Sequence, residues 1–334
     1  MISIFVPLFK QVLKLEDSAY YSEDHLLYHN HFAAMGTRLD MIFHGYPVQT
    51  GHGLADIILQ EIRRLELLMS RYRKDSPVWM INQLGFGKSL VLDDELFNIL
   101  MVCKDFHERT GGLFDIALGA VVDLVRLGEY DPLRFKKLFD SSGMAKVILD
   151  PDSQTIHLRN ELVKVDFGGF GKGYALEQIR KLLLSHGMLN AFISFGESSV
   201  LALGNHPHGA GWKAGVNHQM IKGNNLCSFD LHDESLSTSG IHAGPGDPDP
   251  MGQILHPLRG LINKQYHQIS VKSSSATEAE IVSTALIAAD ESEQRTILAQ
   301  FQPVKATGII YDREGVATIN QLNSRIRSHG KESI

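Results

Sequence analysis

The chain has 334 residues, of which 43% are hydrophobic and 21% charged, a composition typical of a globular protein with one large domain or two modest ones. Its 32 lysines and arginines against 38 aspartates and glutamates give a formal charge of -6, which argues against nucleic-acid binding. The two cysteines, Cys103 and Cys227, exclude a disulfide framework and a cysteine-rich zinc site, and we expect both to be buried free thiols.

The amino-terminal segment has no features of a targeting signal. Residues 2–9 are apolar, but no basic segment precedes them and no small-residue cleavage site follows. No stretch approaches the roughly 20 apolar residues of a membrane span, so we expect a cytoplasmic chain that does not cross a membrane. Residues 1–26 are predicted to form an extension or an added first helix, followed by one domain over residues 27–330.

Hydrophobic periodicity predicts the elements in chain order. Alternating apolar positions indicate strands between residues 28 and 44, and helical spacing indicates a helix over residues 54–68. A second helix is predicted from an N-cap at Asp93 to Phe106. Clusters of strands separated by helices, without regular alternation, favour an α+β fold of mixed sheets with packed helices. The later elements are predicted as strands at 146–149, 155–158, 162–166, 191–195, 198–203, 212–216 and 308–311, and as helices at 175–187, 276–290 and 291–301.

The most distinctive segment is a glycine-rich turn at residues 166–173 (DFGGFGKG), between a predicted strand and a predicted helix. Glycines let the backbone approach a ligand closely, and amides at a helix N-terminus suit phosphate oxygens. The spacing matches neither the Walker pattern nor the dinucleotide pattern, and no other kinase motif accompanies the DFG triplet. The segment is therefore either a tight helix cap or a phosphate site.

A second oxygen-rich segment starts with the capping-box sequence SATE at residues 275–278. In the helix that follows, Glu280, Ser283 and Thr284 are spaced by three and four residues, so their oxygens share one helical face. Proteins usually bind Mg²⁺ through one or two carboxylates, with phosphate oxygens completing the shell. This face is therefore either a Mg²⁺ site or an exposed polar stripe.

Histidine pairs offer another kind of metal site. His29 with His31, or His206 with His208, could chelate an ion from an extended segment. No HExxH or comparable set accompanies either pair, and loop histidines are often simply solvated. The sequence therefore does not predict a histidine metal centre.

Several short motifs follow one another along the chain: residues 35–37 (MGT), the Ser, Tyr and Asn pattern of residues 70–82, 112–119 (GLFDIALG), 166–175 (DFGGFGKGYA), 212–215 (WKAG), 237–240 (STSG) and 278–285 (EAEIVSTA). In this order they resemble the motifs of the FAD:protein FMN transferase, or ApbE, family. The resemblance covers about residues 28–315. Each motif is weak alone, and their common order carries the resemblance.

The resemblance implies an ApbE-like fold with a flavin cleft between two lobes, and a transferase that uses Mg²⁺ to cleave the pyrophosphate of FAD. The FMN moiety would pass to a threonine hydroxyl of an acceptor flavoprotein, and AMP would leave. The implied FAD contacts are Met35, Tyr72, Leu113, Phe114, Asp115, Asp166, Lys172 and Leu255. The implied metal ligands are the Gly169 carbonyl, Glu280, Ser283 and Thr284, of which Glu280 and Thr284 would also be catalytic.

One segment departs from the family pattern. Residues 253–260 (QILHPLRG) stand where the family has H-x-x-D-P-x-T-G, so Gln253 replaces a histidine. An amide cannot accept the proton of a threonine hydroxyl at neutral pH, which makes His256 the candidate catalytic substitute. Two alternatives stay open: a non-catalytic FAD-binding homologue that carries or senses flavin, and an FAD pyrophosphatase that uses water.

Overall fold

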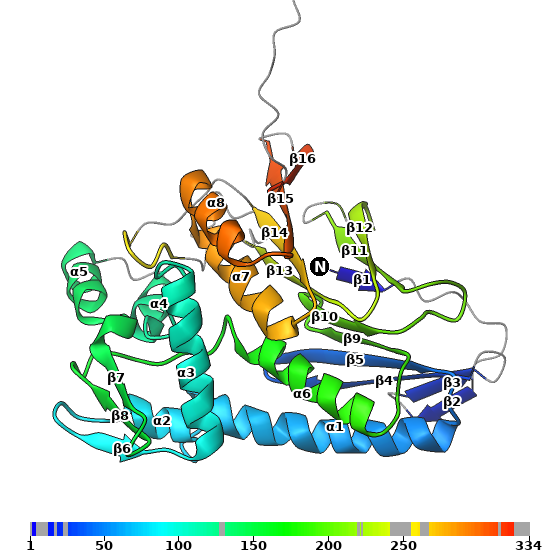
Figure 1. Ribbon diagram of the computed structural model, residues 1–334, viewed down its shortest axis with the longest axis horizontal. Coiled ribbons are helices and arrows are strands. Elements are labelled where there is room, and N and C mark those ends of the chain that lie inside the picture. The colour runs from blue at the N-terminus through cyan, green and yellow to red at the C-terminus, as the bar shows by residue number, and fades with distance from the viewer. Residues whose placement is uncertain are drawn as a thin grey trace, which may run out of the picture.

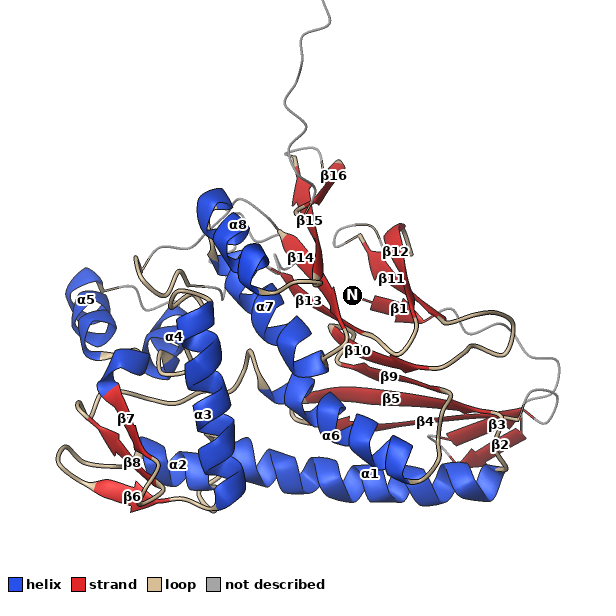
Figure 2. Cartoon of the chain, in the orientation of Figure 1, coloured by secondary structure: helices blue, strands red, loops and turns tan. Residues whose placement is uncertain are grey.

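A ten-stranded sheet forms the centre of the protein (Figures 1 and 2). The computed structural model describes residues 2–4, 13–16, 19–22, 26–126, 131–218, 221, 223–240, 255–260, 267–312 and 315–323. The strand pairs of this sheet are antiparallel. In spatial order its strands are β16 (Ala317–Gln321), β15 (Lys305–Tyr311), β14 (Gln268–Ser273), β13 (Ser235–Gly240), β10 (Ser199–Leu203), β9 (Ala191–Phe195), β5 (Thr37–His44), β4 (Leu27–Ala34), β3 (Ala19–Ser22) and β2 (Leu13–Glu16).

Helices pack on one face of this sheet and a small sheet packs on the other. The helices are α1 (Val48–Met69), α6 (Gly171–Ser185) and α7 (Ala276–Ala288), and their apolar side chains share one core with strands β4, β5, β9 and β14. The small sheet consists of β1 (Ile2–Ile4), β11 (Trp212–Asn217) and β12 (Asn225–Leu231), and a second apolar cluster joins it to the central sheet.

Helix α1 shows how the sequence determines this packing. Leu54, Ile58, Ile62 and Leu65 recur at helical spacing, and all are buried against the sheet. A Cβ atom on Gly51 would lie 2.5 Å from the ring of Tyr28 on β4, so the absence of a side chain lets the helix lie close to the strand. The predicted helix over 54–68 is confirmed, and it extends to the bounds given above.

A smaller lobe adjoins one end of α1, on the left of Figure 1. Its first long helix begins at the predicted N-cap, where the Asp93 carboxylate accepts a 2.8 Å hydrogen bond from the Leu96 N–H. The lobe contains α2 (Pro77–Asn82), α3 (Asp94–Arg109), α4 (Gly119–Arg126), α5 (Pro132–Ser141), a 3₁₀ turn (Met144–Lys146) and the sheet of β6 (Ser89–Val91), β8 (Thr155–Leu158) and β7 (Val147–Asp150). The remaining helix, α8 (Glu291–Gln300), follows α7.

The α+β class and most predicted elements are confirmed, and one predicted strand does not form. Residues 162–166 form only an isolated bridge between Leu118 and Lys164, because the side chain of Asn82 occupies the backbone groups of Val165. Of the two alternatives for residues 1–26, an extension or an added first helix, the helix does not form in the described parts: residues 2–4, 13–16 and 19–22 are strands, and β3 pairs with β4 and extends the central sheet.

The structure also tests the predictions on the two cysteines and on membrane-spanning segments. Cys103 is buried as expected, whereas Cys227 is only half-buried because it lies on β12, in the outer sheet. None of the described helices combines the length and the apolar composition that crossing a membrane requires.

Candidate active site

The glycine-rich turn is anchored to both lobes. The Asp166 N–H donates a 2.7 Å hydrogen bond to the carbonyl of Ile116, in the smaller lobe. Phe170, fully buried in the main core, directly precedes the first residue of α6. The turn therefore lies where the two lobes meet, and the predicted helix start after it is confirmed.

Two glycines of this turn bring it against α7 with no side chains in between. A Cβ atom on Gly169 would lie 3.0 Å from Cγ2 of Thr284, and one on Gly173 would lie 2.6 Å from the carbonyl oxygen of Ala276. A backbone oxygen cannot move aside as a side chain can, so Gly173 has no room for a methyl group. The turn and the oxygen-bearing face of α7 are thus in direct contact, although a hundred residues separate them.

Glu280 is the charged centre of this contact. Its side chain is almost fully buried, and Oε1 accepts a 2.8 Å hydrogen bond from Nζ of Lys172. Oε2 accepts a hydrogen bond from the backbone N–H of Gly173. A buried carboxylate without such partners would be strongly destabilising. Lys172 and Gly173 therefore fix the position of Glu280 at the junction of the lobes.

A cleft of about 330 Å³ lies in front of Glu280, bounded by both lobes, so the predicted cleft between two lobes is confirmed. The central sheet, the smaller lobe, the glycine-rich turn and α7 all contribute residues to its lining. Most of the residues implied by the family resemblance line it: Leu113, Phe114, Asp115, Asp166, Gly169, Lys172, Leu255, Glu280 and Thr284.

The oxygens around Glu280 fit a hard cation. Thr284 lies one helical turn after Glu280 and against Gly169, so a carboxylate, a hydroxyl and a backbone segment share one corner of the cleft. This is the donor set that Mg²⁺ takes, with water or phosphate oxygens filling the other positions. Nζ of Lys172 is the cation now paired with Oε1, so a metal ion would compete with it.

Ser283 differs from the other implied metal ligands. It is fully buried, and its Oγ donates to the carbonyl of Glu280 at 3.0 Å and to Oγ of Ser237 at 3.2 Å. It is not among the residues that line the cleft. In the structure its hydroxyl joins α7 to β13, and its role as a metal ligand stays a prediction.

A wall of hydroxyl groups on the central sheet has no assigned role in the sequence interpretation. Oγ of Ser239 lies 2.9 Å from Oγ of Ser283 and 3.4 Å from Oγ1 of Thr284. Hydroxyls donate and accept hydrogen bonds, so such a wall suits phosphate and sugar oxygens alike. The wall consists of Ser198, Ser199, Ser237, Thr238 and Ser239, and the STSG motif is the sequence signal for the last three of these five residues.

Arg71 is a further functional residue that the sequence interpretation missed. Its guanidinium donates a 2.7 Å hydrogen bond to Oδ2 of Asp166 and forms an ion pair with Asp123. Although burial opposes the charge, Asp166 and Asp123 raise the pKa of Arg71. Arg71 thus orients the first residue of the glycine-rich turn. Its only sequence signal is its place inside the Ser–Tyr motif that begins at residue 70.

Asp115 lies on the opposite side of the cleft. Its carboxylate accepts backbone hydrogen bonds from Ala117 at 2.7 Å and Met144 at 2.8 Å, and Nδ1 of His107 lies 3.6 Å from Oδ2. Burial raises the pKa of Asp115, and these amides and His107 oppose the rise. Both oxygens are held by backbone, so Asp115 fixes the shape of the loop that presents Leu113 to the cleft.

Three other candidate site residues, two implied by the resemblance and His256 as the candidate substitute base, do not line the cleft. Met35 occupies the tight turn between β4 and β5, and Tyr72 is 69% exposed with Arg71 over its ring. His256 is buried, and its Nε2 lies 3.1 Å from the carboxylate of Glu293. Gln253 lies outside the described residues. The roles of Met35, Tyr72 and His256 stay predictions.

The two-lobed α+β fold matches that of known proteins. The ApbE family model matches residues 35–307, so the chain belongs to the ApbE family. The FAD:protein FMN transferase of Treponema pallidum is 23% identical over 300 residues, 80% of each chain. The flavin transferase ApbE of Vibrio cholerae aligns with a TM-score of 0.76 at 18% identity, over 88% of this chain and 96% of that one. The ApbE protein of Thermotoga maritima gives 0.75 at 22% identity, with the same coverage.

Proposed function

We propose that this chain is a Mg²⁺-dependent FAD:protein FMN transferase, which moves FMN from FAD to a threonine of an acceptor flavoprotein and releases AMP. The observation that carries the proposal is the contact of Gly169 with Thr284 beside the Lys172–Glu280 ion pair. It places amides, an ammonium and a set of metal-compatible oxygens in one cleft, as a pyrophosphate requires. Family membership and the names of the relatives give further support.

Each group has a distinct role in this proposal. Mg²⁺ held by Glu280, Thr284 and the Gly169 carbonyl would neutralise the pyrophosphate charge. Lys172, displaced from Oε1, would bind a phosphate oxygen. The hydroxyl wall would hold the ribityl or ribose hydroxyls, and the apolar Leu113 and Leu255 would contact a ring. In the reaction, the threonine oxygen bonds to the phosphorus of the FMN moiety while the bond to the bridging oxygen breaks, and AMP leaves with that oxygen.

The acceptor threonine must also lose a proton. His256 can accept this proton at Nε2 only if Nε2 moves away from Glu293, because Nε2 now lies within hydrogen-bond distance of the Glu293 carboxylate. Glu293 in turn accepts a hydrogen bond from the Asp290 N–H in the capping box of α8. A His256→Gln variant that keeps full transfer activity would assign His256 to this structural network and exclude it as the base.

The test incubates the full chain with FAD and Mg²⁺, with and without a panel of acceptor flavoproteins. We expect AMP, measured by chromatography, and protein-bound flavin, measured by in-gel fluorescence, in equal amounts and only with an acceptor. A Glu280→Gln variant should lose both signals at least about 100-fold, since it removes a charged metal ligand. An Asp56→Asn variant, changed at an exposed position of α1, is the control.

The same assay separates the alternatives. Equal amounts of FMN and AMP without any acceptor would favour an FAD pyrophosphatase and contradict transfer. Stoichiometric FAD retention in equilibrium dialysis, without AMP in any arm, would favour a flavin carrier or sensor. If the chain neither binds FAD nor releases AMP in any arm, the proposal is rejected.

A further inference from the structure

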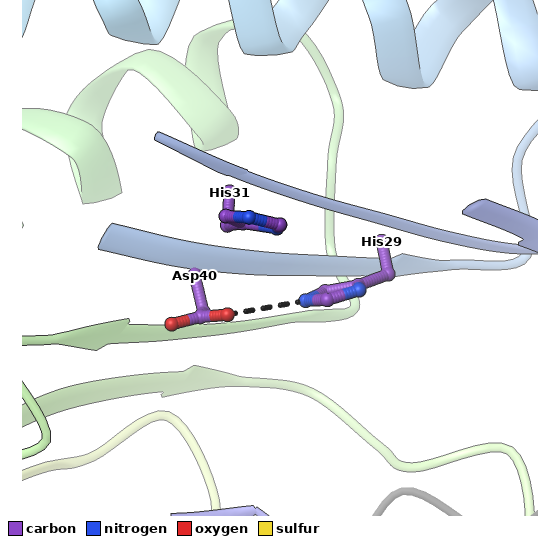
Figure 3. Close-up of side chains that lie close together, drawn as sticks. All are labelled: His29, His31 and Asp40. Atoms are coloured by element: carbon purple, nitrogen blue, oxygen red, sulfur yellow. Dashed lines mark hydrogen bonds and ion pairs between the residues drawn. The ribbon is translucent and has the colours of Figure 1, made fainter. Parts of the chain in front are cut away.

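A cluster of metal-binding side chains lies outside the cleft, on strands β4 and β5. Figure 3 shows His29 and His31 on β4 beside Asp40 on β5. One potential ligand atom from each of the three lies within 4.8 Å of the others. In the described part of the chain this is the only group of three or more histidine, cysteine or acidic side chains so arranged. None of the three lines the cleft.

The antiparallel register explains why these residues meet. His29 and His31 are two residues apart on one strand, so both side chains point to the same face of the sheet. Asp40 pairs directly with His31 across the β4–β5 ladder and shares that face. Tyr28 contacts α1 from the other face, so the cluster lies on the side of the sheet away from α1. The sequence alone could not reveal Asp40 as the third member, because the strand register decides it.

The geometry already resembles a partly assembled metal site. Nε2 of His29 lies 3.3 Å from Oδ1 of Asp40, a separation that ligands on one tetrahedral ion also show when each is about 2.0–2.1 Å from the metal. The rings of His29 and His31 stack with centroids 6.0 Å apart. A ring nitrogen of His31 lies within 4.8 Å of the ligand atoms of the other two residues, so a small movement of this side chain would complete the set of ligands.

The charged groups at Asp40 show what would attract a metal ion and which side chain would compete with it. The side chain of Asp40 is 8% exposed, and burial opposes its ionisation, but hydrogen bonds from His29 and Arg38 lower its pKa. Asp40 therefore offers a negative charge with little access to water. Arg38 now pairs with the same oxygen, Oδ1, yet its own side chain is 60% exposed. A bound ion can take its place while the guanidinium moves into solvent.

We propose that His29, His31 and Asp40 form a binding site for a divalent transition-metal ion, with two imidazoles and one carboxylate as ligands. Such a mixed nitrogen and oxygen set suits Zn²⁺ and disfavours Mg²⁺, which prefers oxygen. Three protein ligands leave a position for water or another ligand. The ion would tie β4 to β5 a few residues from the turn that contains Met35. This site does not depend on the proposed flavin chemistry.

The experiment measures Zn²⁺ binding to the full chain by titration calorimetry. The chain carries no polyhistidine tag, saturating Mg²⁺ is present to occupy the cleft, and Cys227→Ser removes the half-buried thiol as a competing ligand. We expect one Zn²⁺ per chain. The variants His29→Gln and His31→Gln should each weaken binding at least about 10–100-fold, the range for loss of a group that supports a metal ligand.

Two further variants make the test specific. His206→Gln with His208→Gln alters a pair with the same spacing, whose rings are tilted with centroids 5.5 Å apart and which belongs to no three-ligand group among the described residues. This double variant should leave Zn²⁺ affinity unchanged. Arg38→Gln removes the competitor and should tighten binding, a gain that misfolding cannot produce. Absence of Zn²⁺ binding, unchanged affinity in His31→Gln, or no gain in Arg38→Gln would overturn the proposal.

Discussion

Lys172 and Glu280 are 108 residues apart in sequence, yet their charged groups pair at 2.8 Å across the junction of α6 and α7. The lysine belongs to the glycine-rich turn and the glutamate to the helix that the turn contacts. This ion pair is therefore a direct sign that two separately recognised motifs form one site. It also gives the cleft a cation before any metal ion binds.

Removal of that cation should change the response to metal. In Lys172→Met, Glu280 keeps the Gly173 amide of its two hydrogen-bond partners in the described part of the chain, so Mg²⁺ no longer competes with an ammonium. We expect a larger Mg²⁺-induced rise in melting temperature than in the unchanged chain, together with weaker FAD binding. Lys181→Met, on an exposed position of α6, is the control. An equal Mg²⁺ response in both variants would contradict the competition.

Two glycine substitutions, one at the contact of α6 with α7 and one on α1, should have opposite effects on stability. Gly173→Ala would place a methyl group 2.6 Å from a backbone oxygen, which should cost about 1–3 kcal/mol in the free energy of unfolding. Gly53→Ala, in α1 with no atom within 4 Å of the new methyl group, should stabilise by roughly 0.5–1 kcal/mol. Urea unfolding measures both changes. A neutral Gly173→Ala would show that the helices can separate.

Arg71 should be sensitive to replacement because it joins two carboxylates at the start of the turn. Arg71→Met leaves Asp166 and Asp123 without their cation, and we expect a loss near the lower end of about 3–5 kcal/mol, since Asp123 is 42% exposed. Arg73→Met, whose pair with Asp75 is exposed on both sides, should have little effect. Similar unfolding midpoints for the two variants would argue against a structural role for Arg71.

Asp115 predicts a dependence of stability on pH. Its pKa in the folded chain is raised above the usual 3.8, so the folded state binds the proton more tightly than the unfolded state. The stability that this group contributes is present at low pH and is lost as the pH rises through the folded-state pKa. We expect the unfolding free energy of the unchanged chain, relative to Asp115→Asn, to fall above about pH 4. A flat difference would show that the backbone hydrogen bonds cancel the burial effect.

Local patterns predicted the parts of the fold that carry their own signal. Helices α1, α3, α6 and α7 have apolar residues at helical spacing or clear caps, and Asp93 marks the start of α3. The segment 162–166 also contains apolar residues. However, the backbone N–H and C=O of Val165 form hydrogen bonds with the side-chain amide of Asn82 and not with a neighbouring strand. Hydrogen bonding to a distant side chain in place of a strand depends on the tertiary fold, so no hydrophobic periodicity in the sequence reveals it.

In the candidate site, too, local sequence patterns predicted some features, and others depend on the tertiary fold. The glycine spacing and the oxygens of α7 are local, so the sequence indicated Gly169, Glu280 and Thr284 as potential ligands. Their mutual contact depends on how α6 packs on α7. Arg71 and the hydroxyl wall carry little local signal, because arginine and serine are common on any surface. The pairing of His31 with Asp40 depends on strand register alone.

The walls of the cleft come from segments that span the chain from Leu113 to Ala288. No fragment of the polypeptide can therefore assemble the site before the central sheet and both lobes have formed. A ligand held there binds only the completed structure, so mass action should increase the population of folded chains as the ligand concentration rises. Under the proposed function, the supply of flavin in a cell would govern how long this protein survives proteolysis as well as how fast it works.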